Sequence, residues 1–238
     1  GDGRLGYLLV SQDVEQVETV KIVVKPSRAI EVRVVDPEGR AIEGADVHLL
    51  SNLAQLVEGR TDADGRWTAD APADAVNWAV YALKSKLGFD YAATARTRAS
   101  LESPPPLPER LTLTLDGARP PLRVKTIDES GKPLAGVLVG PWLIKKPGRD
   151  SSLNGMSEAM LKTDAAGVAT FDWLPLQIED QFAILARSPG RYLPNHHAAV
   201  FADKPTDEVT LELSAYQRMT GRVTTADGRP SAGALVQV

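Results

Sequence analysis

The sequence contains no cysteine and only three histidines in 238 residues. The lack of cysteine excludes disulfide bonds, thiolate zinc sites and a cysteine nucleophile. No apolar run approaches the roughly 20 residues that span a bilayer. The first ten residues also lack the basic start, apolar core and cleavage site of a signal peptide. We therefore expect no direct membrane insertion.

Basic residues are not in excess either. Lys and Arg number 27 against 31 Asp and Glu, which gives a net charge of −4 and a pI near 5.5. A nucleic-acid-binding protein needs a basic surface to displace phosphate counterions, so we expect no nucleic-acid partner. The 43% hydrophobic and 24% charged residues are typical of a folded globular chain.

One phrase of fourteen residues occurs three times without a gap. The copies are VVDPEGRAIEGADV (34–47), TIDESGKPLAGVLV (126–139) and VTTADGRPSAGALV (223–236). Glycine recurs at the same two places in each copy, first at Gly39, Gly131 and Gly228 and then at Gly44, Gly136 and Gly233. The copies lie 92 and 97 residues apart, a spacing that indicates a small domain repeated in tandem.

Two further phrases recur in the same order. TDADG begins at Thr61 and TDAAG at Thr163, and the alternating strands RLTLTL (110–115) and EVTLEL (208–213) follow later. A similar strand, ETVKIVV, precedes the first copy of the longer phrase. We therefore predict closing strands of a preceding unit over 1–26, complete units over 27–117 and 118–215, and opening strands of a further unit over 216–238. We expect the chain to be a fragment of a longer array.

Hydrophobic residues alternate with polar ones in most segments. In AIEVRVVD, Ile30, Val32 and Val34 fall on one face and Glu31 and Arg33 on the other, as in a half-buried strand. About seven strands per 90 residues predict an all-β fold of antiparallel β-sandwiches. The expected core aromatics are Trp67, Trp78, Tyr81, Phe171, Trp173 and Phe182. Only 51–59 and 153–162 are candidates for short helical turns.

The order of these phrases resembles the carboxypeptidase regulatory-like domain. The matching residues are Asp36, Gly39, Gly44, Ala45, Val47, Thr61, Asp62, Gly65 and Trp67 in the first unit, and Asp128, Gly131, Pro133, Gly136, Val139, Thr163, Asp164, Gly167, Leu174 and Pro175 in the second. Ala41 and Ala169 depart from the pattern, and the first unit lacks the leucine before Pro72. The resemblance implies transthyretin-like Greek-key sandwiches without catalytic residues, as found beside metallocarboxypeptidases and in bacterial surface and periplasmic proteins.

Few residues are candidates for chemistry. His196 and His197 are adjacent, and adjacent strand residues point to opposite faces, which suits a metal site poorly. We expect them and His48 to be surface histidines. The Asp62-x-Asp64-Gly65 spacing resembles the start of a calcium loop, but its twelfth position is Ala73 rather than glutamate, which favours an Asp-capped turn. We predict no catalytic residue, no cofactor and no metal.

The second unit carries ten extra residues in the segment 140–161. Long loops on a sandwich are common places for binding. The candidate binding residues are Trp142, Lys145, Lys146 and Arg149, which could stack on a sugar or meet an acidic partner. The alternative is that Trp142 and Leu143 cover the neighbouring sandwich or the seam between units.

These observations lead to one interpretation and two alternatives. We expect a non-catalytic spacer, scaffold or adhesion-type module of a larger bacterial exported protein, periplasmic or at the cell surface. A carbohydrate- or cell-wall-binding module and the accessory region of a peptidase or other enzyme are the alternatives. The expected partners are adjacent domains of a longer chain and a protein or polysaccharide. Because the joins between units are short and the first contains Pro120 and Pro121, we expect a semi-rigid rod.

Overall fold

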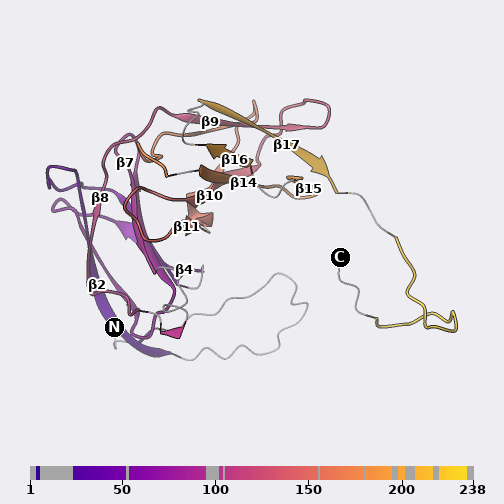
Figure 1. The fold of residues 1–238 in the computed structure, drawn as a ribbon, viewed down its shortest axis with the longest axis horizontal. Helices are drawn as coiled ribbons and strands as arrows, with labels where there is room; N and C mark the ends of the chain where they lie inside the picture. Colours follow the sequence, from indigo (N-terminus) through magenta and orange to yellow (C-terminus); the bar gives the residue numbers. More distant parts are fainter. Residues whose placement is uncertain are drawn as a thin grey trace.

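The computed structural model describes residues 4–5, 24–51, 54–94, 102–103, 105–154, 156–179, 181–194, 198–201, 207–216 and 220–234. Its strands form four sheets that face each other in two pairs (Figure 1). The all-β sandwich fold predicted from the alternating pattern is confirmed. The predicted boundaries of the tandem units stay a prediction.

Eight strands among the described residues build the first sandwich. They are β1 (Arg4–Leu5), β2 (Lys25–Val35), β3 (Asp46–Ser51), β4 (Ala54–Arg60), β5 (Arg66–Pro72), β6 (Trp78–Lys84), β7 (Gly88–Ala93) and β8 (Arg110–Thr114). One sheet has the order β1-β2-β5 with β8 also on β2, and the facing sheet has the order β4-β3-β6-β7. Inward residues of both sheets, such as Val32, Val47 and Val80, are fully buried between them.

The second sandwich repeats this plan with additions. Its elements are β9 (Leu122–Asp128), β10 (Leu138–Ile144), β11 (Leu153–Asn154), the 3₁₀ turn η1 (Ser157–Ala159), β12 (Leu161–Lys162), β13 (Val168–Phe171), β14 (Gln181–Arg187), β15 (Arg191–Tyr192), β16 (Ala198–Phe201) and β17 (Glu208–Ala215). One sheet has the order β13-β9-β17-β15, and the other has the order β11-β10-β14-β16 with β12 also on β10.

Two strand pairs depart from the expected antiparallel arrangement. β8 runs parallel to β2, and β17 runs parallel to β9. In each sandwich the chain passes through the opposite sheet between these two strands, which gives it the length that a parallel connection requires. β2 and β8 are therefore neighbours in the first sandwich, as β9 and β17 are in the second.

Of the two segments expected to form helical turns, one does and one does not. Residues 153–162 contain the 3₁₀ turn η1 between the two-residue strands β11 and β12, whereas 54–60 forms β4, which pairs with β3. In β4, pairing with a neighbouring strand outweighs the local propensity, because cross-strand contacts decide strand formation more than intrinsic preference does. All six expected core aromatics are buried, with exposed fractions of 8% or less.

The phrase that occurs three times forms the same turn three times. An isolated bridge closes each copy, between Val35 and Ala41, Ile127 and Pro133, and Thr224 and Pro230. The first glycine of each phrase has φ near +80°, a conformation that favours glycine. In the second copy, Asp128 Oδ1 accepts hydrogen bonds from the backbone N–H groups of Ser130 and Lys132 at 2.9 and 3.0 Å. The repeated phrase thus encodes a turn that is stabilised by hydrogen bonds among its own residues.

Replacing Asp128 with alanine tests this turn. A hydrogen bond from the Ser130 hydroxyl, followed by the N–H of Lys132, lowers the pKa of Asp128 below its ordinary value of 3.8. A lowered folded-state pKa stabilises the fold above the unfolded-state value, and this stabilisation is lost as pH falls through the folded-state value. We expect Asp128→Ala to lower the urea midpoint slightly at pH 7 and to approach the wild type progressively as the pH falls below 3.8. Asp150→Ala, at an exposed carboxylate, is the control and should change neither the midpoint at pH 7 nor its dependence on pH.

Candidate functional site

The two sandwiches are joined by a continuous apolar seam. Leu50, Tyr81, Phe89 and Tyr91 lie on the face of the β4-β3-β6-β7 sheet that points away from its own core, yet each is at most 2% exposed. They belong to the hydrophobic cluster of the second sandwich. The rings of Phe89 and Trp173 are 5.5 Å apart. The second sandwich therefore covers the outer face of this sheet.

A cluster of four charged side chains closes one edge of the seam. Asp90 alternates with Phe89 and Tyr91 along β7 and so faces the opposite side of the sheet, where it is fully buried. Its Oδ2 accepts a hydrogen bond from the N–H of Thr114 at 2.8 Å and another from Arg149 Nη2. Asp90 thus ties β7 to β8 within the first sandwich and to the loop that follows β10 in the second.

Lys146 is the second cation of this cluster. Its Nζ lies 3.0 Å from Asp116 Oδ1 and 3.4 Å from Asp90 Oδ1, and it donates to the carbonyl of Phe89 at 3.0 Å. Lys146 is only 5% exposed. Two carboxylates and two cations balance, and this compensates the cost of taking charge out of water.

The segment 115–121, which connects β8 to β9 and is called the join below, is held by backbone hydrogen bonds on both sides. They run from Gly117 N to Leu87 O (3.1 Å), Lys86 N to Asp172 O (2.9 Å), Arg119 N to Leu174 O (3.0 Å) and Leu176 N to Gly117 O (3.2 Å). A side chain at Gly88 would overlap the carbonyl of Gly117, so β7 and the join approach closely because residue 88 is glycine. The Tyr91 hydroxyl also donates to Ser151 O at 2.7 Å, while burial raises its pKa.

The four residues of the predicted binding loop lie in different surroundings. Lys146 and Arg149 contact the first sandwich in the cluster just described. Lys145 forms an ion pair with Glu179 at 3.1 Å. Trp142 is partly exposed and lies where the register of β10 against β14 shifts between Pro141 and Leu143. Binding of a ligand by this loop stays a prediction.

His48 is not the surface histidine that the sequence suggested. It is 8% exposed and stacks on Tyr81, with ring centroids 4.6 Å apart. The position does point outward from the first core, but the second sandwich covers that face. His196 and His197 lie outside the residues that the structure describes.

The Asp62 segment is the Asp-capped turn that was favoured over a calcium loop. Asp62 Oδ1 accepts hydrogen bonds from the N–H groups of Asp64 and Arg66, both at 2.9 Å, and Asp164 does the same for Ala166 and Val168. Within the described ranges, His, Asp and Glu side chains nowhere gather in a group of three that could hold a metal ion. No helix in those ranges has the length and apolarity to cross a membrane.

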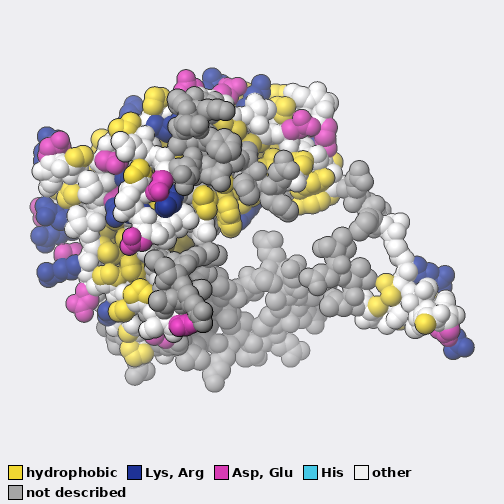
Figure 2. All heavy atoms as spheres, in the orientation of Figure 1, with side chains coloured by type: hydrophobic (Ala, Val, Ile, Leu, Met, Phe, Trp, Pro, Cys, Tyr) yellow, Lys and Arg dark blue, Asp and Glu magenta, His cyan; other side chains and the backbone are white. Residues whose placement is uncertain are grey.

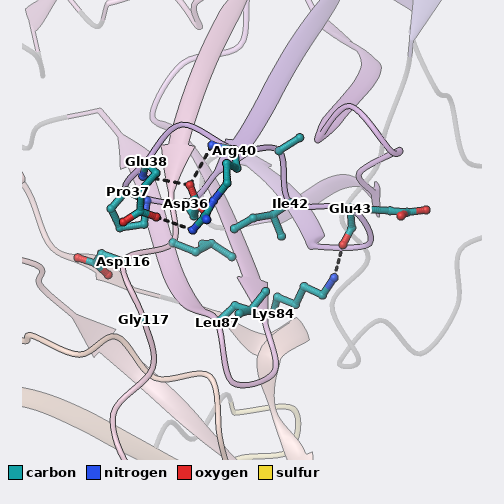
Figure 3. Close-up of a pocket in the computed structure, with 12 residues that line it drawn as sticks. Asp36, Pro37, Glu38, Arg40, Ile42, Glu43, Lys84, Leu87, Asp116 and Gly117 are labelled. Atoms are coloured by element: carbon teal, nitrogen blue, oxygen red, sulfur yellow. Dashed lines mark hydrogen bonds and ion pairs between the residues drawn. The ribbon is translucent and has the colours of Figure 1, made fainter.

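A hollow of about 550 Å³ adjoins the join (Figure 3). Ile42, Leu87 and Leu115 supply its apolar lining. Arg40 is held by Asp36 and Glu38 at 2.5 and 2.7 Å. Partial desolvation opposes ionisation of Asp36, but its hydrogen bonds with Arg40 prevail and lower its pKa. The charges of this turn are thus largely satisfied within the protein.

The surface seen in Figure 2 carries basic and acidic side chains interspersed over the first sandwich.

Asp90 and Asp116 were not among the candidate residues predicted from the sequence, although both belong to the charged cluster at the seam. One signal was present: Asp90 interrupts the apolar stretch GFDYAA, and a buried charge requires a partner.

No family model matches this sequence, and no curated protein matches it. Among solved structures it is similar to the shaft pilin SpaA from Lactobacillus rhamnosus GG, at 9% identity and a TM-score of 0.32, over 82% of this chain and 100% of that one. It is similar to GBS52, the minor pilin of Streptococcus agalactiae, at 16% identity and a TM-score of 0.28, over 84% and 100%. The Bacillus anthracis TIE protein matches at 11% identity and a TM-score of 0.30, over 82% of this chain and 36% of that one. Similarity this distant identifies no family and assigns no function.

Removing Asp90 tests the charged cluster. Asp90→Ala leaves Arg149 and the N–H of Thr114 without their carboxylate and leaves Lys146 with Asp116 alone. Removing one member of a buried ion pair costs on the order of 3 kcal/mol, and we expect a loss of this size in urea unfolding. Lys145→Ala breaks a partly exposed pair in the same loop and should cost less than about 1 kcal/mol. Equal losses would contradict the role given to Asp90.

Proposed function

We propose that this chain is a non-catalytic structural module, a spacer or scaffold made of tandem β-sandwiches. We also propose that it belongs to a larger bacterial exported protein, at the cell surface or in the periplasm. The first part is supported by the seam. Domains joined in one chain usually move relative to one another unless their interface is large and hydrophobic. Here the apolar contacts, the charged cluster and the bonded join favour a fixed orientation.

A fixed orientation is useful for holding other domains at a set distance. The seam charges are used within the chain, which argues for a structural role of the 140–161 segment. The repeated phrases resemble those of carboxypeptidase regulatory-like domains, and this resemblance supports the same structural role. It also supports the proposed exported location, which the resemblance implies.

Small-angle scattering and ¹⁵N relaxation test the proposal together. We expect the two sandwiches to scatter as one rigid shape and to share one rotational correlation time. Asp90→Ala should make the two correlation times differ, with spectral changes confined to β7, β8 and the 140–161 segment. Lys145→Ala should leave the two correlation times equal. Independent tumbling in the wild-type chain would rule out the rigid spacer.

A second candidate function is binding of a polysaccharide at Trp142. The observation that favours it is the register shift at this residue, since an irregularity of this kind redirects a side chain. A partly exposed indole suits stacking on a sugar ring.

A glycan array tests this second function directly. We expect binding to at least one bacterial polysaccharide by the wild type, with loss of the signal in Trp142→Ala. Tyr192→Ala is the matched control, because Tyr192 is a 41% exposed aromatic outside the 140–161 segment. A signal that survives Trp142→Ala, or no wild-type signal, would exclude this site.

A further inference from the structure

Each sandwich contains one parallel ladder, between β2 and β8 in the first and between β9 and β17 in the second. In the first sandwich, the ladder runs from the pair Glu31–Arg110 to the pair Val35–Thr114. In the second, it runs from Arg123–Glu208 to Asp128–Leu213. The chain enters the second sandwich through β9 and leaves it through β17. In the first sandwich it leaves through β8, and β2 is preceded by the two-residue strand β1, which pairs with β2 antiparallel.

Parallel pairing places these entry and exit points at opposite ends of the ladder. The entering strand begins at one end, and the leaving strand finishes at the other, because both run in the same direction. Tension on the chain is then directed along the strands. It loads the hydrogen bonds of the ladder together, whereas tension across a ladder breaks them one after another.

Buried side chains protect the ladders from water on one side. In the first, Val32, Val34 and Leu113 are fully buried. A backbone hydrogen bond breaks at lower cost when water can replace the lost partner. Excluding water from the inner side therefore raises the cost of sliding one strand along the other.

The same protection is found in the second sandwich. Val124 and Leu213 are fully buried and Leu211 is 1% exposed. The join between the two ladders is itself bonded to both sandwiches, through Gly117 and Arg119. A pulling force therefore passes from one ladder to the next through an ordered segment.

We propose that the β2–β8 and β9–β17 ladders are mechanical clamps, and that the chain acts as a tension-bearing tether. The use of such a tether rests on the structural role proposed above. The clamp itself is a property of strand direction, so it can hold or fail independently of the rigid seam.

Single-molecule pulling in two directions tests the clamp. The natural chain has no cysteine, so two introduced cysteines define the points of attachment. Arg123→Cys with Glu212→Cys pulls along the β9–β17 ladder, and Arg123→Cys with Glu208→Cys pulls across its first pair. All three side chains are exposed. Either variant unfolds nearly the same residues and releases about 300 Å of chain at roughly 3.4 Å per residue.

We expect the unfolding force along the ladder to be several-fold higher than the force across it. Equal forces in the two directions would overturn the clamp. Thermal unfolding of both variants without attachment provides the control, since equal midpoints assign the difference to direction rather than to stability. If the wild-type chain tumbles as one body but the two unfolding forces are equal, the rigid spacer stands and the clamp is rejected. If the sandwiches tumble independently but the two forces differ, the clamp stands and the rigid spacer is rejected.

Discussion

The sheet β4-β3-β6-β7 is apolar on both faces, and the rest of the architecture depends on this constraint. One sandwich can cover only one face of it. Tyr81, Phe89 and Tyr91 lie on the other face, and complete burial of a large apolar side chain is worth roughly 1.5–3 kcal/mol. Left in water, they would form an exposed patch prone to association. The second sandwich is thus part of the fold of the first, although each has its own pair of sheets.

The contact between the sandwiches also takes charged groups out of water at the β7 edge of this sheet. Asp90 is fully buried, and such a carboxylate is tolerated when paired and hydrogen-bonded. Its partners Lys146 and Arg149 come from the loop that the second sandwich adds. Apolar contacts tolerate many orientations, but a buried ion cluster tolerates few because each charge left unpaired is costly. The apolar face supplies the attraction, and the cluster supplies the orientation.

The parts of the fold that could be predicted from the sequence are the local ones. Asp36, Asp128 and Gly39 form turns through bonds to their own neighbours, so their chemistry is visible in a few consecutive letters. Strand direction was not visible, because a period of two is the same in parallel and antiparallel ladders. The burial of His48 and Lys146 could not be predicted either. Alternation tells which face a residue occupies, but not what covers that face.

The repeat itself does not encode the seam. In the first sandwich, β6 turns into β7 over three residues, and this short turn contacts the join and Asp172. In the second, ten residues separate β14 from β16, and β15 within them crosses to pair with β17. Tyr192 stacks there on Tyr216. The connection from β14 to β16 therefore differs in length and residues from the β6–β7 turn. A third sandwich could not pack against the second through the same contacts that the second makes with the first. Repeated turns therefore define each sandwich, and the loops that differ define how one sandwich meets another.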